Sequence, residues 1–239
     1  MLRWRIHTKA ETVSTNLDAA AGAPGDVFMA DFQTGGRGRL DHKWLSAPGA
    51  NLLMSVVLDV AGLSPETVST LPLAVGLSVA EGLSPFLRRG LSPQVKWPND
   101  VLVEGRKLAG ILCERRDDRV IAGIGVNIGE TAFPPEIAGR ATSLVLLGDG
   151  DRPSVPAVRD AVLAALGRIC EDWRRDGFAA VYPRLREIDF LRGQSLSVWQ
   201  TDGDPEPIRG LCGGICPDGT LDVGGRKVYA GEAHVEKIG

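Results

Sequence analysis

The sequence has no long hydrophobic run, few cysteines and no excess of basic charge. Its longest apolar stretch, residues 52–58, is interrupted by Ser55 and is too short to cross a bilayer. The first six residues lack the hydrophobic region of a signal peptide, so we expect neither export nor membrane insertion. The formal net charge is −3, so the chain lacks the overall basic surface with which proteins bind nucleic acids.

Four cysteines in 239 residues are too few for a disulfide framework, so we expect reduced thiols and a cytoplasmic protein. Cys113 and Cys170 lie in apolar patterns and are predicted to pack in the core. Cys212 and Cys216 form a C-x3-C pair, but a structural zinc ion needs two more ligands and only His234 lies nearby. We therefore predict no metal site at this pair.

What remains is an ordinary globular composition, with 44% hydrophobic and 24% charged residues. Alternation predicts strands at residues 2–7, 27–32, 52–58, 95–97, 101–103, 106–115 and 119–128, the last four as an antiparallel meander. Helical spacing predicts helices at residues 14–21, 64–87, 154–173 and 177–188, with interruptions at Pro72 and Pro183. Short strands separated by Gly-containing turns predict a small all-β domain at residues 191–239, after a larger domain at residues 1–190.

Residues 33–43 show no apolar periodicity and form a Gly- and Arg-rich loop. The run Gly36-Arg37-Gly38-Arg39 is neither a Walker A loop nor a dinucleotide-binding fingerprint. Two guanidinium groups on an unhindered backbone can instead close around a phosphate or a carboxylate. The alternatives are a mobile solvated loop or an RNA-contacting Arg-Gly segment.

A lysine at a strand end favours the anion clamp. By period two, Lys107 shares a face with Ala109, Ile111 and Cys113, which places a cation at the rim of an apolar wall. A surface charge is the competing explanation. Gly110 leaves the strand interior open to close approach of a flat ligand.

A second polar cluster follows the strand at residues 95–97. Lys96, Asn99 and Asp100 combine a cation, an amide and a carboxylate at a strand–turn junction, which suits a nucleotide or Mg²⁺. In the partner strand, Asn127 offers a donor and an acceptor after Gly123 and Gly125. Adenine or an amide would fit beside it.

Together these motifs resemble the bacterial biotin protein ligases. The resemblance spans residues 13–128 and rests on residues 14–16, 33–39 with Trp44, 96–100, 106–112 and 125–127, in order and spacing. It implies an α+β fold with a mixed, largely antiparallel sheet, flanking helices and a C-terminal SH3-like barrel. It also implies a two-step reaction. Biotin and ATP give biotinyl-5'-AMP and pyrophosphate, and a lysine of a carboxylase's biotin carboxyl carrier domain then takes the biotinyl group.

Carried over residue by residue, the resemblance assigns Lys107, Arg37 and Arg39 to catalysis. It assigns to biotin Ser14, Thr15, Asn16, Gln33, Arg37, Gly38, Arg39, Lys107 and Gly110. It assigns to the nucleotide Lys96, Asn99, Asp100, Asn127 and Trp44, without individual roles. ATP and Mg²⁺ are implied as substrate and activating ion, with no metal held by the protein alone.

Two departures from the family pattern qualify the resemblance. Leu40, Asp41, His42 and Lys43 replace the usual basic and glycine residues before Trp44, so the charge and ordering of the loop can differ. Only thirteen residues precede Ser14, so we expect no helix-turn-helix domain and no operator binding. A homodimer is plausible by analogy with the family.

Three other functions compete with biotin ligation. Lipoate ligases and octanoyltransferases share the fold, but Gln33 and residues 14–16 favour a ureido ring over an aliphatic chain. A non-catalytic biotin or nucleotide sensor is disfavoured by Lys107, and an RNA-contacting module by the acidic pI near 5.7.

Overall fold

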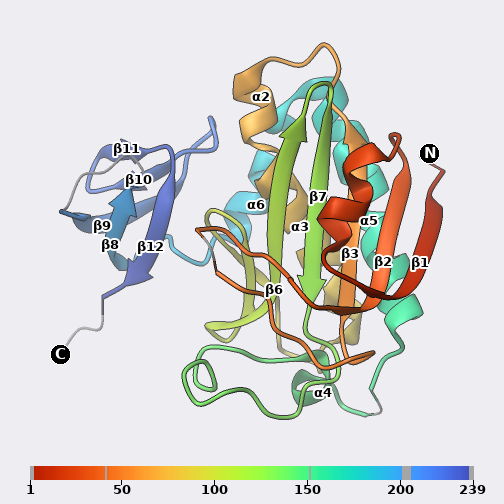
Figure 1. The fold of residues 1–239 in the computed structure, drawn as a ribbon. Coiled ribbons are helices and arrows are strands. Elements are labelled where there is room, and N and C mark those ends of the chain that lie inside the picture. The colour runs from red at the N-terminus through yellow and green to blue at the C-terminus, as the bar shows by residue number, and fades with distance from the viewer. Residues whose placement is uncertain (1–2, 41, 151, 201–205, 237–239) are drawn as a thin grey trace.

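The computed structural model describes residues 3–40, 42–150, 152–200 and 206–236, which are organised around two β-sheets (Figure 1). The larger sheet has the strand order β1-β2-β3-β7-β6-β5-β4. Its strands are β1 (Arg5–Thr12), β2 (Asp26–Gln33), β3 (Leu52–Asp59), β4 (Gln94–Lys96), β5 (Asp100–Val103), β6 (Arg106–Arg116) and β7 (Arg119–Val126). Only β1 and β2 pair in parallel, which confirms the mixed, largely antiparallel sheet.

Helices cover one face of this sheet and leave most of the other for the functional site (Figure 1). The covering layer contains α3 (Leu71–Leu83), α5 (Val155–Asp176) and α6 (Tyr182–Glu187). Helix α5 buries its apolar stripe, and Ser154 caps it by accepting a hydrogen bond from the N–H of Ala157 (3.3 Å). On the opposite face, the short helix α1 (Thr15–Asp18) leads into Ala19, which packs on Val57 and Ile121.

The predicted helix at residues 64–87 is divided in two. Thr70 separates α2 (Pro65–Ser69) from α3, and Pro72 lies in the first turn of α3, where a missing N–H is tolerated. The stretch Pro65–Phe86 is long and apolar enough for a membrane span, but 72% of the 18-residue window that meets this criterion is buried inside the protein. Burial of this kind is typical of a core helix.

The C-terminal region forms the predicted all-β unit. Its five antiparallel strands have the order β11-β10-β9-β8-β12: β8 (Ser195–Gln200), β9 (Ile208–Ile215), β10 (Leu221–Val223), β11 (Arg226–Val228) and β12 (Gly231–Val235). The indole N–H of Trp97 donates to the carbonyl oxygen of Gly219 (3.2 Å), and Tyr182 donates to that of Ile215 (3.1 Å). These contacts hold the small sheet against α6 and against the segment that follows β4.

A buried carboxylate forms a third contact between the two sheets. Asp189 accepts hydrogen bonds from the N–H groups of Ile215 (2.7 Å) and Leu191 (3.1 Å). Burial raises the pKa of the Asp189 carboxyl, and those two donors oppose the shift. The backbone beside it pairs with Val95 on β4, so Asp189 joins β4 to β9.

Gly214 is the residue that lets this carboxylate reach β9. Its φ is +100°, and a Cβ there would lie 2.6 Å from Asp189 Oδ2. We expect Gly214→Ala to lower the free energy of unfolding by about 2–4 kcal/mol, from backbone strain and overpacking. Urea denaturation measures this loss, with Gly139→Ala as control because a Cβ there meets nothing within 4 Å. Equal stability of the two variants would contradict this account of the junction.

Some elements differ from the sequence expectations. The first strand starts later than the pattern at residues 2–7 predicts, and Leu2 lies outside the described residues. Only residues 182–187 of the predicted helix at 177–188 are α-helical. Sequence patterning also missed α4 (Leu144–Leu147). It forms where the chain after β7 returns to the sheet, so tertiary contacts and not periodicity place it.

All four cysteines are free thiols, as predicted. Burial raises the pKa of the Cys113 and Cys170 thiols to about 12. Cys212 is buried and Cys216 is half-buried. Among the described residues, no group of three or more His, Cys, Asp or Glu side chains could hold a metal ion.

Candidate functional site

A cleft of about 790 Å³ lies on the sheet face opposite α3 and α5. The loop after β2 covers it, β6 and β7 form its floor, and β12 of the small sheet reaches one end. All fourteen residues singled out in the sequence line this one cleft: Ser14, Thr15, Asn16, Gln33, Arg37, Gly38, Arg39, Trp44, Lys96, Asn99, Asp100, Lys107, Gly110 and Asn127. The fold therefore brings together motifs that are more than a hundred residues apart in the chain.

The strand register explains the flat floor of the cleft. Leu53, Gly125, Gly110 and Asp100 stand side by side across four strands. Two glycines in this row let Trp44 lie directly on the backbone, since a Cβ at Gly125 would be 2.6 Å from its indole ring. The indole N–H of Trp44 is buried and has no hydrogen-bond partner within the described part of the chain.

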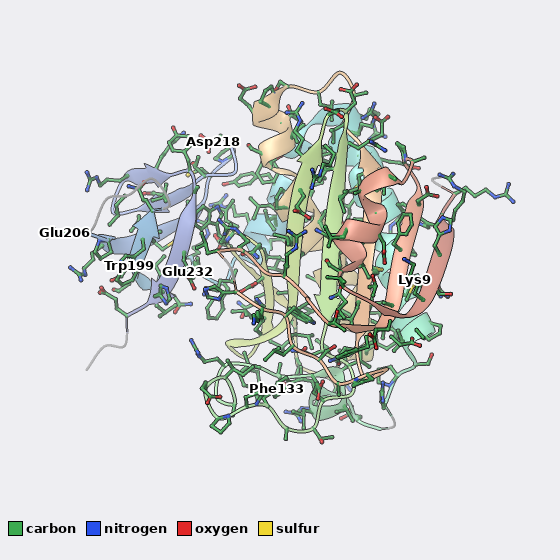
Figure 2. All side chains as sticks on the ribbon, in the orientation of Figure 1. Lys9, Phe133, Trp199, Glu206, Asp218 and Glu232 are labelled. Carbon is green, nitrogen blue, oxygen red and sulfur yellow. The ribbon has the colours of Figure 1, made fainter. Side chains whose placement is uncertain are left out.

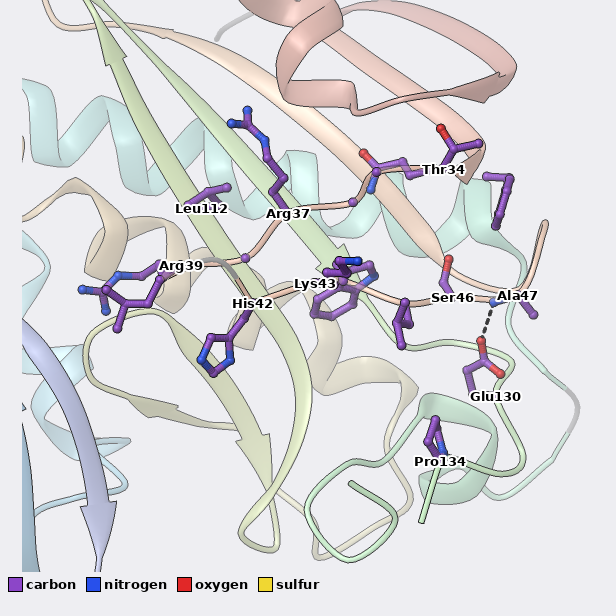
Figure 3. Close-up of a pocket in the computed structure, with 18 of the residues that line it drawn as sticks. Thr34, Arg37, Arg39, His42, Lys43, Ser46, Ala47, Leu112, Glu130 and Pro134 are labelled. Atoms are coloured by element: carbon purple, nitrogen blue, oxygen red, sulfur yellow. Dashed lines mark hydrogen bonds between the residues drawn. The ribbon is translucent and has the colours of Figure 1, made fainter. Parts of the chain in front are cut away.

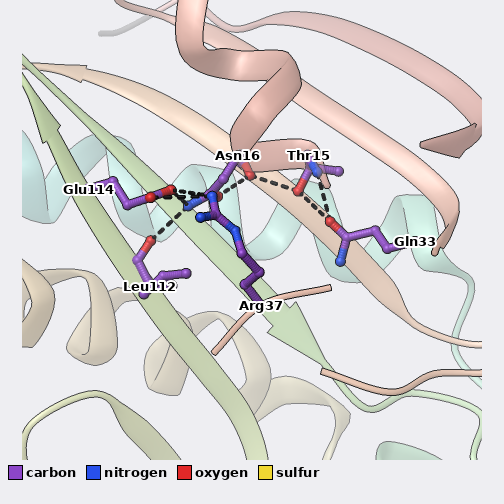
Figure 4. Close-up of polar contacts among 7 residues, drawn as sticks. Thr15, Asn16, Gln33, Arg37, Leu112 and Glu114 are labelled. Carbon is purple, nitrogen blue, oxygen red and sulfur yellow. Dashed lines mark hydrogen bonds and ion pairs between the residues drawn. The ribbon is translucent and has the colours of Figure 1, made fainter. Parts of the chain in front are cut away.

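One end of the cleft is lined by neutral polar side chains from α1, β2 and β3, beside the ion pair of Glu114 and Arg37 (Figure 4). Gln33 Oε1 accepts hydrogen bonds from the backbone N–H (2.7 Å) and the hydroxyl (3.1 Å) of Thr15. Ser55 Oγ lies 2.7 Å from Thr15 Oγ1 and donates to Asn16 Oδ1 (2.6 Å). Ser14 precedes α1 as predicted and lines the cleft, but its side chain makes no capping hydrogen bond.

The network fixes which polar atoms remain for a ligand. A backbone N–H can only donate, so Gln33 must turn its carbonyl oxygen to Thr15 and its NH₂ group away. Asn16 likewise directs its carbonyl oxygen to Ser55 and its NH₂ group to the Glu114 carboxylate (2.6 Å). This end of the cleft therefore presents the NH₂ donors of Gln33 to a ligand carbonyl.

Lys107 points into the middle of the cleft. Its Nζ lies 2.7 Å from Asp100 Oδ1 and 5.8 Å from the centre of the Trp44 ring. A Cβ on Gly110 would be 3.2 Å from this ammonium group, so Lys107 and Gly110 share one face. An ammonium group with a carboxylate on one side and an aromatic ring on the other suits a ligand anion.

The expectation that Lys107 shares a face with Ala109, Ile111 and Cys113 is wrong. Val101 pairs with Ala109 but Leu102 pairs with Lys107, so Leu108 is an extra residue on β6. This bulge reverses the alternation and turns Lys107 away from the core face. The same bulge aims the lysine at the cleft.

The other end of the cleft is rich in charge. The guanidinium of Arg39 donates to Asn99 Oδ1 (3.5 Å) and to the carbonyl oxygen of Gly231 on β12 (3.3 Å). Burial lowers the pKa of Arg39 and of Lys96, and the carboxylates of Asp100 and Glu232 oppose both shifts. These cations lie where burial strengthens their attraction for a phosphate.

The loop over the cleft closes on itself as a narrow hairpin. The N–H of Trp44 donates to the carbonyl oxygen of Gly36 (3.0 Å), and that of Gly38 to His42 (2.6 Å). A second hollow of about 860 Å³ adjoins it, with Glu130 and Pro134 on its far wall (Figure 3). Of the residues that depart from the family pattern, Leu40, His42 and Lys43 line both hollows, while Asp41 lies outside the described residues.

The pattern that describes the biotin/lipoate A/B protein ligase family matches residues 5–129. The chain is 35% identical to the biotin--[acetyl-CoA-carboxylase] ligase of Mycobacterium tuberculosis, over 97% of this chain and 89% of that protein. The chain belongs to the biotin/lipoate A/B protein ligase family. It is also 30% identical to the bifunctional ligase/repressor BirA of Escherichia coli, over 82% of this chain and 61% of that protein.

Solved structures of the family agree with the fold. The biotin protein ligase from Aquifex aeolicus in complex with biotin and ATP has a TM-score of 0.83 and 28% identity, and covers 97% of this chain and 98% of that one. A single-residue mutant of the same Aquifex aeolicus enzyme in complex with biotin has a TM-score of 0.84 at 27% identity, over 99% of each chain. The α+β architecture with a large mixed sheet is thus the architecture of this ligase family.

Several residues of the ligase cleft were missed by sequence reasoning. Glu130, Phe133, Arg140 and Glu232 line it, and Ser55 and Glu114 hydrogen-bond to lining residues. Glu114 could have been found, because it shares the β6 face of Gly110 and Leu112 by period two. Glu232 could not, because only the packing of the small sheet brings it to the cleft (Figure 2).

Proposed function

We propose that this protein is an ATP-dependent biotin protein ligase. The observation that carries the proposal is one cleft with an end of neutral polar side chains, a glycine floor and a cationic end, with Lys107 between the two ends. Biotin has the matching order of parts: a neutral ureido ring, an aliphatic chain and a carboxylate. The name and the biotin and ATP complex of the relatives support the same assignment.

In the first step, a carboxylate oxygen of biotin attacks the α-phosphorus of ATP. A bond forms between that oxygen and phosphorus, the bond to the β-phosphate bridge breaks, and pyrophosphate leaves. Lys107 and Arg39 stabilise the negative charge that grows on the phosphoryl oxygens, and Arg37 holds the loop over the acid. We assign the nucleotide to Lys96, Asn99, Asp100, Asn127 and Trp44, which all line the cleft.

In the second step, a lysine amine of an acceptor protein attacks the carbonyl carbon of biotinyl-5'-AMP and AMP leaves. The proposed acceptor is the biotin carboxyl carrier domain of a carboxylase.

The oxygens present also suit Mg²⁺ as the ion that accompanies ATP. Asp100 supplies a carboxylate, and Asn127 keeps its Oδ1 for the cleft because its NH₂ donates to Thr142 (3.0 Å). One carboxylate plus substrate phosphates is the usual Mg²⁺ environment in such sites. Bound there, the ion would neutralise phosphate charge.

We further propose that residues 1–190 form the catalytic domain and that residues 191–239 form an SH3-like domain, supported by the separate five-stranded sheet. The free thiols support a cytoplasmic location. A homodimer is proposed only by family analogy, and sedimentation of the purified protein would test it.

Recognition of the ureido ring can be tested with a variant that leaves the shape of the side chain unchanged. Glu is isosteric with Gln, so Gln33→Glu keeps the acceptor for Thr15 and replaces the NH₂ donors by a second acceptor. We expect the KM for biotin to rise about 10–100-fold and the KM for ATP to stay within about twofold. An unchanged KM for biotin would remove Gln33 from the recognition site.

The experiment that tests the proposed function is pyrophosphate release from ATP and Mg²⁺ with biotin, lipoate or octanoate. Release that depends on biotin alone is expected. Release with lipoate or octanoate instead would make the protein an acyl ligase for another carrier. Release with none of the three acids would leave a binding protein and contradict the proposal.

A further inference from the structure

Glu114 on β6 contacts both the sheet and the loop of the cleft (Figure 4). Its Oε2 accepts a hydrogen bond from Asn16 Nδ2 (2.6 Å) and lies 3.2 Å from the guanidinium of Arg37. Its Oε1 accepts from the same guanidinium (3.3 Å). One carboxylate therefore binds an amide of the ureido-recognition end and the first arginine of the covering loop.

The negative charge of Glu114 between Asn16 and Arg37 requires an explanation. The proposed ligands, biotin and ATP, are both anionic, and a carboxylate beside their cleft repels them. The hydrogen bond to Asn16 needs only an acceptor, which a glutamine would also provide. Of the two contacts, only the one to Arg37 uses the charge.

We propose that Glu114 is a positioning residue that links ligand recognition at Asn16 to the placement of Arg37 and the covering loop. In the free enzyme it holds Arg37 against the sheet, so part of the ordering of the loop precedes ligand binding. The amide that meets the ligand and the arginine that closes over it share one anchor. The identity of the ligand rests on the proposed function, whereas the two contacts do not.

Two variants separate the two contacts. Glu114→Gln keeps an acceptor for Asn16 and removes the ion pair with Arg37, whereas Glu114→Ala removes both. Glu104→Gln is the control. Glu104 lies in the exposed turn before β6 and pairs with Arg106, so this variant removes the same charge from a surface ion pair. Variants are compared only if their melting temperatures lie within about 3 °C of the wild type. If Glu114→Ala does not fold, the isosteric Glu114→Gln alone tests the ion pair with Arg37.

The first readout is limited trypsin cleavage after Arg37, Arg39 and Lys43 in the ligand-free protein, mapped by mass spectrometry. We expect cleavage in Glu114→Gln about two- to fivefold faster than in the wild type or Glu104→Gln, the effect of one half-exposed ion pair. Cleavage at the control rate would overturn the role in placing the loop. This readout needs no enzymatic activity, so it remains decisive even if the proposed function fails.

The second readout separates positioning from general structural support. We expect Glu114→Ala to raise the KM for biotin about tenfold or more and to leave the KM for ATP within about twofold, since Asn16 loses its partner. Glu114→Gln should raise the KM for biotin by only a few-fold. Equal increases in both KM values for Glu114→Ala would show a merely structural residue and overturn the link.

Discussion

Lys107→Ala should lower the rate of biotin-dependent pyrophosphate release about 10²–10³-fold. Lys107 is the cation that the β6 bulge turns into the centre of the cleft, 2.7 Å from Asp100 and against Trp44. Lys96, which also interacts with Asp100, is largely buried, so Lys107 is the more accessible of the two lysines at the floor. Stopped assays of pyrophosphate at saturating biotin and ATP measure the effect directly.

Lys9→Ala is a suitable control for this variant. Lys9 lies on β1 and pairs with Asp18 (2.7 Å), outside the cleft (Figure 2). It removes the same charge and should leave the rate unchanged. A Lys107→Ala enzyme that retains more than about a tenth of the wild-type rate would contradict a catalytic role for this lysine.

Gly123→Ala is expected to have the second largest effect, on biotin recognition. A Cβ at Gly123 would collide with the side-chain oxygen of Asn16. Ser55 donates to this oxygen and Glu114 accepts from the NH₂ group, so the amide is held at both atoms. Because those two hydrogen bonds resist movement of the amide, the methyl group must displace Asn16 from the recognition end. We expect the affinity for biotin to fall about 10–100-fold, measured by calorimetry.

Gly139→Ala again provides the matched control, since a Cβ there meets nothing within 4 Å. ATP binding is the internal control, because the nucleotide end of the cleft does not contact Gly123. Wild-type affinity for biotin in Gly123→Ala would mean that the ligand head does not bind beside Asn16.

Local pattern predicted much of the fold. Alternation found β2, β3, β6 and β7, and helical spacing found α5, because these elements bury one regular face. Pro72 predicted the break in the helix at residues 64–87, because proline is tolerated in the first turn of a helix but not in its interior. The chain after β7 was not predicted, because α4 and its flanks are held by contacts with distant segments.

The candidate site was predictable as a set of residues but not as an arrangement. Motifs identified the fourteen residues that meet in the cleft. Alternation nevertheless put Lys107 on the wrong face, because a strict period of two does not allow for the extra residue Leu108. The contact between Arg39 and Gly231 joins residues 192 positions apart. No local pattern encodes such a contact.

The most direct measurement of the central claim is transfer of biotin to protein. The enzyme is loaded with biotin, ATP and Mg²⁺, freed of small molecules, and mixed with an apo biotin carboxyl carrier domain that is then analysed by mass spectrometry. The account predicts one biotinyl group on a single lysine of the carrier, and none with Lys107→Ala. An unmodified carrier, with wild-type enzyme that has released pyrophosphate, would contradict the assignment as a protein ligase.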